Sequence, residues 1–141
     1  QFGKPINSFQ MVQKMLADMA IKTEAARSLV HSVAATVDAG KAAEASKKAA
    51  MAKCFATDVA MEVATDAVQV FGGYGFMEDY PIAKFFRDAK ILQIYEGTNQ
   101  IQRMVVARAL IKEAADLEHL EAYIPSEEQG TFSDEPVITG H

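Results

Sequence analysis

The chain of 141 residues has one cysteine, no tryptophan and four prolines. A single cysteine excludes an internal disulfide and is typical of a reducing compartment. The three histidines lack ligand spacing, so we predict no metal site. A formal net charge of −5 without a long basic run argues against nucleic acid as a partner. No apolar run is long enough for a membrane span, and no signal peptide is visible.

What is present is an ordinary globular composition, with 50% hydrophobic and 23% charged residues. A chain of this length buries one core. The first residue is not methionine, and Gln1-Phe2-Gly3-Lys4-Pro5 reads as the interior of a longer polypeptide. We therefore expect a fragment of a longer protein from a bacterial cytoplasm, with the mitochondrial matrix as the alternative compartment.

Two long helices are predicted first. Apolar residues recur at three- and four-residue steps from Ser8 to Asp38, where Ser8 can cap the start and Gly40 can close the end. A second helix runs from about Lys41 to Phe71. Its last turns, from Val59 to Phe71, are apolar on more than one face, which indicates burial on two sides, by the bundle and by something outside it.

Two further helices follow a glycine-rich break. Pro81 is a good first residue for a third, shorter helix. A fourth helix begins at Thr98, and its predicted inner stripe carries Arg108 among the apolar residues Ile101, Met104, Val105 and Ile111. Four helices joined by short turns predict an all-α fold, an antiparallel up-down four-helix bundle.

The end of the chain changes character. Acidic residues and helix breakers dominate from Glu113 onward. A short helix to about Tyr123 and then an extended or loosely docked arm are expected. We therefore divide the chain into a helical domain, 1–113, and an acidic C-terminal extension, 114–141.

The segment from Ile94 to Arg103 reads Ile-Tyr-Glu-Gly-Thr-Asn-Gln-Ile-Gln-Arg. Glu96 lies just ahead of a predicted helix start, where backbone N–H groups converge. Such a charge can simply stabilise the helix N-terminus, by about 0.3–1 kcal/mol. Alternatively, the apolar residues before Glu96 indicate partial burial, which would raise its pKa and make it a better base. The local pattern leaves both interpretations open.

Other candidate residues also have two interpretations. The glycines in 71–75 can end a helix or let backbone approach a ligand closely. Gln10, Gln69 and Gln100 can be ordinary surface residues or donors to a phosphate, ribose or ring edge. Arg108 can extend its guanidinium to the rim or pair with a carboxylate at a polar site.

Three ordered blocks of the sequence together resemble the C-terminal helical domain of the FAD-dependent acyl-CoA dehydrogenases. They are the segments 1–10, 66–75 and 80–98, the last ending in the Tyr-Glu-Gly-Thr turn. The likeness extends to about Ile111. A dehydrogenase of the short- or medium-chain type is the expected branch, because relatives that take their base from another helix lack a glutamate at this turn.

The resemblance implies a reaction and a set of roles. Acyl-CoA dehydrogenases remove the α-proton of an acyl-CoA thioester while the β-hydrogen leaves as hydride to FAD, and electrons pass to electron-transfer flavoprotein. Glu96 matches the catalytic base. The matched FAD contacts are Phe2, Gln10, Gln69, Gly72, Gly73, Thr98 and Gln100. Tyr95 and Gly97 match the thioester end of the substrate channel, and Arg108 matches an arginine near the active site.

The resemblance also implies missing partners. The N-terminal and middle domains of such an enzyme, and an arginine upstream of the Phe-Gly pair, lie outside this sequence. The isolated chain is therefore expected to be inactive and to assemble, with the rest of the enzyme, into a dimer or tetramer. Two alternatives stay open: a non-catalytic helical oligomerisation fragment, and a glutaryl-type decarboxylating dehydrogenase or acyl-CoA oxidase.

Overall fold

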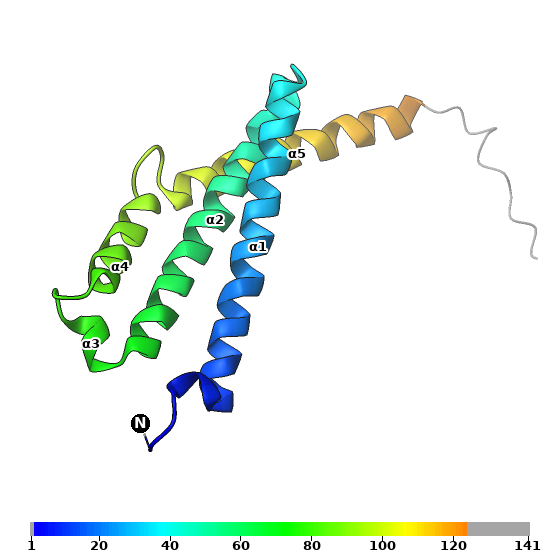
Figure 1. The fold of residues 1–141 in the computed structure, drawn as a ribbon. Helices are drawn as coiled ribbons and strands as arrows, with labels where there is room; N and C mark the ends of the chain where they lie inside the picture. The colour runs from blue at the N-terminus through cyan, green and yellow to red at the C-terminus, as the bar shows by residue number, and fades with distance from the viewer. Residues whose placement is uncertain (1, 124–141) are drawn as a thin grey trace, which may run out of the picture. The chain divides into compact units, whose positions relative to one another are not determined.

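The computed structural model describes the backbone of residues 2–123, and their side chains except at 42, 43, 118 and 120–123. These residues form five α-helices and one 3-10 turn, and no strand is found among them. The elements are η1 (Ile6–Ser8), α1 (Gln10–Asp38), α2 (Ala42–Phe71), α3 (Gly73–Phe76), α4 (Pro81–Leu92) and α5 (Asn99–Tyr123) (Figure 1). The predicted all-α class is confirmed. The arm predicted beyond Tyr123 lies outside the described residues.

The chain divides into two compact units, Gln1–Ala109 and Leu110–His141. The first unit contains α1 to α4 and the opening turns of α5, the segments predicted to form the bundle. None of the helices described between residues 2 and 123 has the apolar length that crossing a bilayer requires.

Helices α1 and α2 form an antiparallel pair joined by a tight turn (Figure 1). Gly40 ends α1 as predicted, since its φ of 74° lies in the left-handed region and its N–H donates to the carbonyl of Val37 at 2.9 Å. The predicted cap at Ser8 is wrong. Its hydroxyl donates to the Pro5 carbonyl at 2.7 Å within η1, and Phe9 occupies the cap position without a side-chain bond.

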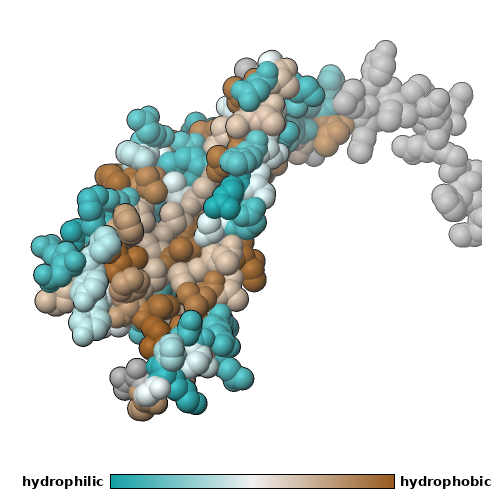
Figure 2. Space-filling view, viewed as in Figure 1, coloured by the Kyte–Doolittle hydropathy of each residue, from teal (hydrophilic) through white to brown (hydrophobic). Residues whose placement is uncertain are grey.

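The core of Gln1–Ala109 lies where α2 packs against α1 on one side and α4 on another. Both neighbours belong to the predicted bundle, so the second cover expected for the last turns of α2, from outside the bundle, stays a prediction. The buried apolar residues of this core are mostly small: Ala26, Val33, Ala45, Ala50, Ala52, Cys54, Val59, Ala64, Ile82, Ala83 and Ala89. Figure 2 shows apolar side chains gathered over the region where these helices meet. Small side chains let helix axes approach closely, at the lower end of the usual 8–10 Å range.

A short helix, α3, occupies the glycine-rich break that was predicted as a simple turn. Gly72 ends α2 with a φ of 62°. Gly75 is buried, and a Cβ there would lie 2.5 Å from the Val68 carbonyl oxygen and 2.9 Å from Phe71 Cβ. Gly75 is therefore needed for close packing of α3 on the end of α2.

The predicted inner stripe of α5 is only partly covered in this chain. Ile101 and Met104 are about half exposed, and Arg108 is exposed as well. Ile111 is 70% exposed too, so the buried inner stripe predicted for α5 is not found within the described residues of this chain. The 3.6-residue period carries no information about which segment would cover these residues.

Candidate functional site

The Glu96 loop, residues 94–98, connects α4 to α5. Glu96 and Gly97 both have left-handed backbone, with φ of 52° and 87°. Glycine suits the second position, where a Cβ would lie 2.7 Å from Gln102 Nε2. Thr98, predicted to begin the fourth helix, lies just before α5, and its Oγ1 accepts a bond from the Ile101 N–H at 3.3 Å. Glu96 therefore stands just ahead of a helix N-terminus.

The outer side of the Glu96 loop is exposed in this chain. Ile94 and Tyr95 are 49% and 48% exposed, and Glu96 is exposed too. The partial burial expected for Glu96 is therefore not found within the described residues. The apolar side chains before Glu96 face outward, because the loop is anchored to the rest of the fold through polar groups instead.

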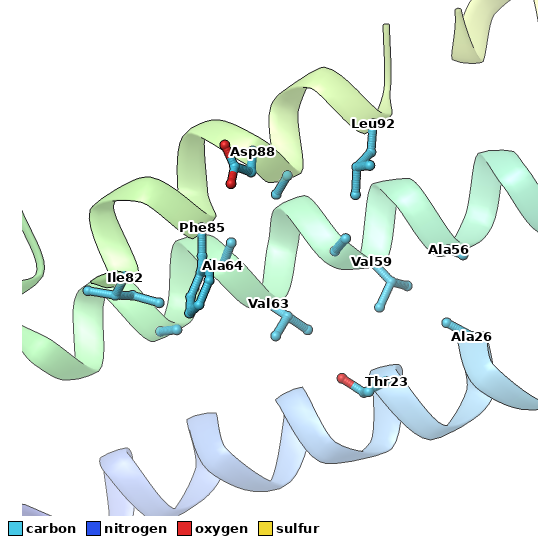
Figure 3. A pocket seen from close by; sticks show the side chains of 13 residues that line it. Thr23, Ala26, Ala56, Val59, Val63, Ala64, Ile82, Phe85, Asp88 and Leu92 are labelled. Carbon is cyan, nitrogen blue, oxygen red and sulfur yellow. The ribbon is translucent and has the colours of Figure 1, made fainter. Parts of the chain in front are cut away.

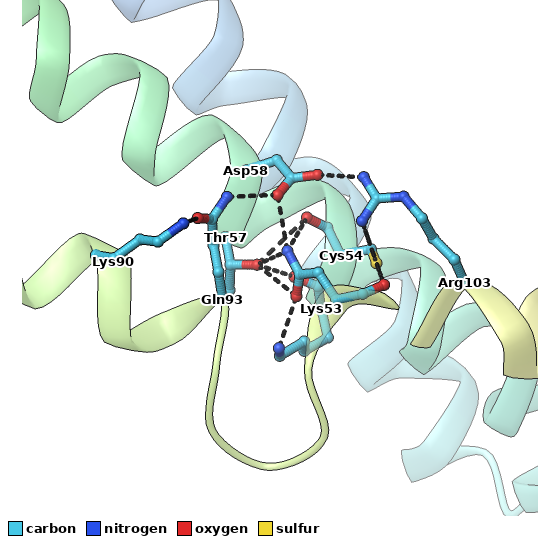
Figure 4. A network of polar contacts seen from close by, with 8 residues as sticks. Lys53, Cys54, Thr57, Asp58, Lys90, Gln93 and Arg103 are labelled. Atoms are coloured by element: carbon cyan, nitrogen blue, oxygen red, sulfur yellow. Dashed lines mark hydrogen bonds and ion pairs between the residues drawn. The ribbon is translucent and has the colours of Figure 1, made fainter. Parts of the chain in front are cut away.

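The anchor of this loop is Asn99, which is only 3% exposed. Its Nδ2 donates to Asp58 Oδ1 at 2.7 Å and to Thr57 Oγ1 at 2.8 Å (Figure 4). Its backbone carbonyl accepts bonds from the Cys54 thiol at 3.2 Å and from Arg103 Nη1, also at 3.2 Å. All of these partners except Arg103 lie on α2. The first residue of α5 is thus bound tightly to the middle of α2.

Asp58 joins this network to a charge. Its Oδ2 accepts a bond from Arg103 Nη2 at 2.6 Å, and Gln93 Nε2 donates to its Oδ1 at 2.7 Å. Burial raises the pKa of Asp58, but the hydrogen bonds from Arg103, Asn99 and Gln93 outweigh it and hold that pKa below its usual value. The bond to Asp58 raises the pKa of Arg103. The carboxylate therefore stays ionised at neutral pH.

A polar cavity of about 200 Å³ opens beside this network. Two residues predicted to bind cofactor, Thr98 and Gln100, both line it. Its other lining residues are Asp58, Lys90, Gln93, Ile94, Asn99 and Arg103. Hydrogen-bonding groups and cations at one helix start make this a suitable place for a polar or anionic ligand.

The other predicted cofactor residues lie at a second place. Phe2 and Gln69 line one cavity of about 250 Å³, together with Ile6, Phe9, Val12, Met15 and Val70. Gln10 is the first residue of α1 and directly follows Phe9, which lines this cavity. Gly72 directly follows the end of α2. A Cβ on Gly72 or Gly73 would meet nothing within 4 Å, so their backbone is open to an approaching group.

These two groups of predicted residues are separated by α4. A helix of 12 residues is about 18 Å long. The glycine-rich break precedes α4, and the Glu96 loop follows it (Figure 1). One compact ligand therefore cannot touch both groups in one copy of this chain. An extended ligand could span both groups, or two copies could each supply one group to a shared ligand.

An apolar groove of about 480 Å³ is lined by residues of α1, α2 and α4 (Figure 3). Val63, Phe85 and Leu92 project toward it from α2 and α4, and Thr23 faces it from α1. Asp88 is the single charged residue of its lining.

Sequence reasoning missed the residues that hold the loop. Lys53, Asp58 and Asn99 were not singled out, although an amide in the first turn of α5 was noted. Arg103 was quoted only as part of the motif, while Arg108 was proposed for the site. Arg103 is the arginine that contacts the network, and Arg108 is exposed one and a half turns further along α5.

Comparison with known proteins identifies the family. Residues 1–111 match the family described as acyl-CoA dehydrogenase, C-terminal domain. The chain belongs to this family.

Curated relatives include a cyclohexane-1-carbonyl-CoA dehydrogenase from Geobacter metallireducens, 56% identical over 114 residues. That match covers 81% of this chain and 30% of the relative. A short-chain-specific acyl-CoA dehydrogenase from Megasphaera elsdenii is 54% identical over 79% of this chain and 29% of its own length. The chain thus spans less than a third of these relatives.

Solved structures give the same result. Butyryl-CoA dehydrogenase from Megasphaera elsdenii aligns with a TM-score of 0.76 and 54% identity, over 79% of this chain and 28% of that one. A chain from a structure of the electron transferring flavoprotein of Acidaminococcus fermentans aligns with a TM-score of 0.75 and 61% identity, over 78% of this chain and 28% of that one.

Proposed function

We propose that this chain is the C-terminal domain of a flavin-dependent enzyme that oxidises acyl-CoA thioesters to trans-2-enoyl-CoA. The family match over residues 1–111 is the observation that carries the proposal. Relatives named for butyryl-CoA and cyclohexane-1-carbonyl-CoA support an acyl-CoA thioester as the substrate class.

Glu96 is the proposed catalytic base. Its carboxylate would take the α-proton of the thioester, and FAD would supply the acceptor for the β-hydrogen as hydride. A positioned base that acts while hydride leaves avoids a free carbanion. Tyr95 and Gly97 would line the thioester end of the substrate channel, and Arg108 would lie near the active site. Exposure of the loop supports this role, since the substrate must reach Glu96 from outside this domain.

The residues present fit a flavin nucleotide. Thr98 and Gln100 line a polar cavity, and the open backbone at Gly72 and Gly73 lies near the cavity of Phe2 and Gln69. Gln10 would join the second group. Because α4 separates the groups, each copy would offer two half-sites. This arrangement supports a dimer or tetramer in which two copies share each FAD.

Electron-transfer flavoprotein is the proposed electron acceptor. This proposal is supported by the chain, 61% identical to this one, from the structure of the electron transferring flavoprotein of Acidaminococcus fermentans. The curated relatives cited here come from bacteria, which favours a bacterial cytoplasm over the mitochondrial matrix. The domain limits proposed from the sequence, 1–113 and 114–141, are retained.

The direct test is Glu96→Gln in the full-length flavoenzyme that carries this chain. Turnover with a short acyl-CoA should fall at least about a thousandfold, within the range for loss of a general base. The FAD content should stay unchanged, because Glu96 is not among the proposed flavin contacts. Turnover at the wild-type rate would refute the role of Glu96. Replacing electron-transfer flavoprotein by dioxygen as acceptor, and assaying carbon dioxide from glutaryl-CoA, separates the oxidase and decarboxylase alternatives.

A second candidate, a non-catalytic oligomerisation module, is favoured by one observation. Exposed large apolar side chains are numerous among the described residues, including Met11 (73%), Ile21 (66%) and Phe76 (83%), as expected if a partner covers part of this surface. Light scattering of the isolated chain, with and without FAD, tests this role. A stable oligomer that takes up no flavin would support it for the isolated chain.

A further inference from the structure

The two ends of the Glu96 loop meet at one carboxylate oxygen. Gln93, directly after α4, and Asn99, the first residue of α5, each donate a side-chain bond of 2.7 Å to Asp58 Oδ1 (Figure 4). The Asn99 N–H also donates to the Gln93 carbonyl at 3.0 Å. The loop is therefore closed at its base, and its base is bound to α2.

A lysine from α2 reaches further into the loop. Lys53 Nζ donates to the carbonyl of Gly97 at 2.9 Å and to Asn99 Oδ1 at 2.6 Å. From the other side, Gln102 Nε2 donates to the carbonyl of Glu96 at 3.1 Å. The carbonyls of Glu96 and of its neighbour Gly97 are thus held by donors from two different helices.

These contacts act on a strained residue. Glu96 has a φ of 52°, a left-handed conformation that a residue with a side chain adopts at a cost. Such a conformation persists only where the surrounding structure over-determines it. The bonds to the carbonyls of Glu96 and Gly97, and the closed base of the loop, provide that constraint.

The side chains of Lys53, Asp58 and Asn99 form a clamp on the loop, and their hydrogen bonds allow one arrangement. Asn99 is buried, and its amide oxygen faces Lys53 while its amide nitrogen faces Asp58. The Lys53 cation can only donate and the Asp58 carboxylate can only accept, so the two together fix the orientation of the Asn99 amide. Among the described residues, no buried side-chain nitrogen or oxygen lacks a partner. The buried polar groups of the network are therefore fully hydrogen-bonded.

We infer that Lys53, Asp58 and Asn99 are positioning residues that fix the direction of the Glu96 carboxylate through the backbone of its loop. The inference rests on the proposed function of Glu96. None of the three is proposed to touch substrate, and Lys53, unlike Asp58 and Asn99, does not line the polar cavity assigned to the flavin. Their effect is on the rate of proton removal, because small misplacements of a reacting group cost large factors in rate.

Lys53→Met in the full-length flavoenzyme tests the inference. Methionine keeps an apolar stem of similar length and removes the bonds to Gly97 and Asn99. We expect kcat to fall by about tenfold or more, with KM and FAD content changed less than about twofold. Lys53→Arg, which can donate to both oxygens, should recover most of the loss. Lys22→Met is the matched control: Lys22 also links two helices, through an ion pair with Glu62 at 2.7 Å, and its loss should leave kcat unchanged.

Hydrogen exchange of the same holoenzymes gives a readout independent of turnover. The amides of Tyr95, Asn99 and Gln102, which donate to the carbonyls of Ile91, Gln93 and Thr98, should exchange at least about tenfold faster in Lys53→Met than in wild type, while those of α1 stay unchanged. Asp58→Asn, which keeps the side-chain shape, should show the same pattern if Lys53→Met fails to fold.

Unchanged kcat and unchanged exchange in both folded variants would overturn the inference. A loss of kcat that parallels a loss of FAD would also overturn it, because that would show a general structural role. Failure of the proposed function is distinguished by Glu96→Gln. If that variant turns over normally while exchange still responds to Lys53→Met, the clamp exists but Glu96 is not the base.

Discussion

Asp58 and Asn99 lie 41 residues apart in the sequence, and their side chains are joined by a hydrogen bond of 2.7 Å. This bond ties the start of α5 to the middle of α2. It places the Glu96 loop relative to the α1–α2–α4 core. Because the loop carries the proposed base, the packing of two helices and the chemistry of one side chain depend on the same contact.

The first prediction concerns the pH dependence of stability at Asp58. Its pKa is lower in the folded protein than the ordinary value of 3.8. A depressed pKa stabilises the fold above the ordinary value, and that stabilisation is lost as pH falls through the folded pKa. Wild type should therefore be more stable than Asp58→Asn at pH 7, and the difference should shrink below about pH 4. Urea unfolding of both proteins across this pH range measures it. A difference that grows toward low pH would contradict the sign.

The second prediction concerns Gly97→Ala. The left-handed φ of 87° should cost about 1–2 kcal/mol for a residue with a Cβ. The new Cβ would also displace Gln102 Nε2, which lies 2.7 Å from its position and bonds the Glu96 carbonyl. Both stability and turnover should fall.

Gly40→Ala is the control for Gly97→Ala. Gly40 has a φ of 74° and open space around its Cβ position. The loss of thermal stability should be similar, but turnover of the full-length enzyme should stay near wild type. Equal losses of turnover in the two variants would remove the special role of the loop.

The third prediction separates two glycines of the break between α2 and α4. Gly75→Ala should destabilise the protein by about 1–3 kcal/mol, because its Cβ would overlap backbone and Cβ atoms of α2 that cannot move aside easily. Gly73→Ala should leave stability nearly unchanged, since its Cβ meets nothing within 4 Å. If Gly73 contacts FAD as proposed, Gly73→Ala should instead weaken flavin binding, as measured by fluorescence titration. Unaltered flavin affinity would argue against that contact.

The fourth prediction tests where the core lies. Ile82 on α4 is 8% exposed, and Ile82→Ala should cost about 2–5 kcal/mol in the free energy of unfolding. Ile101 on α5 is 50% exposed in this chain. In the isolated chain, Ile101→Ala should cost less than about 0.5 kcal/mol. A large cost at Ile101 would show that another segment covers α5.

The helices could be predicted from the sequence because their signals are local. Gly40 and Pro81 mark an end and a start that the structure confirms, and the helix start predicted at Thr98 is within one residue of the start of α5 at Asn99. Ser8 was predicted to cap α1 because a hydroxyl at a helix start usually does so. The nearby Pro5 carbonyl takes its bond instead, through a short 3-10 turn that no periodicity reveals.

The clamp could not be predicted, because the residues that hold the loop come from three segments: Lys53 and Asp58 from α2, Gln93 from the residue after α4, and Asn99 from the start of α5. Lys53 and Asp58 are five residues apart on α2 and resemble ordinary surface charges in the sequence. Asn99 looks like a typical first-turn amide. Only the packing of α4 and α5 against α2 brings these groups within 2.7 Å of one another. The exposure of Glu96 was likewise invisible locally, since apolar neighbours in a sequence do not show which way a loop faces.

The most direct measurement for the central claim is single-turnover reduction of the flavin under anaerobic conditions, in the full-length enzyme with a short acyl-CoA. In wild type, the flavin absorbance should bleach rapidly on mixing. In Glu96→Gln, with the same FAD content and substrate affinity, the rate constant should fall at least about a thousandfold. Bleaching of Glu96→Gln at the wild-type rate would show that another group removes the α-proton.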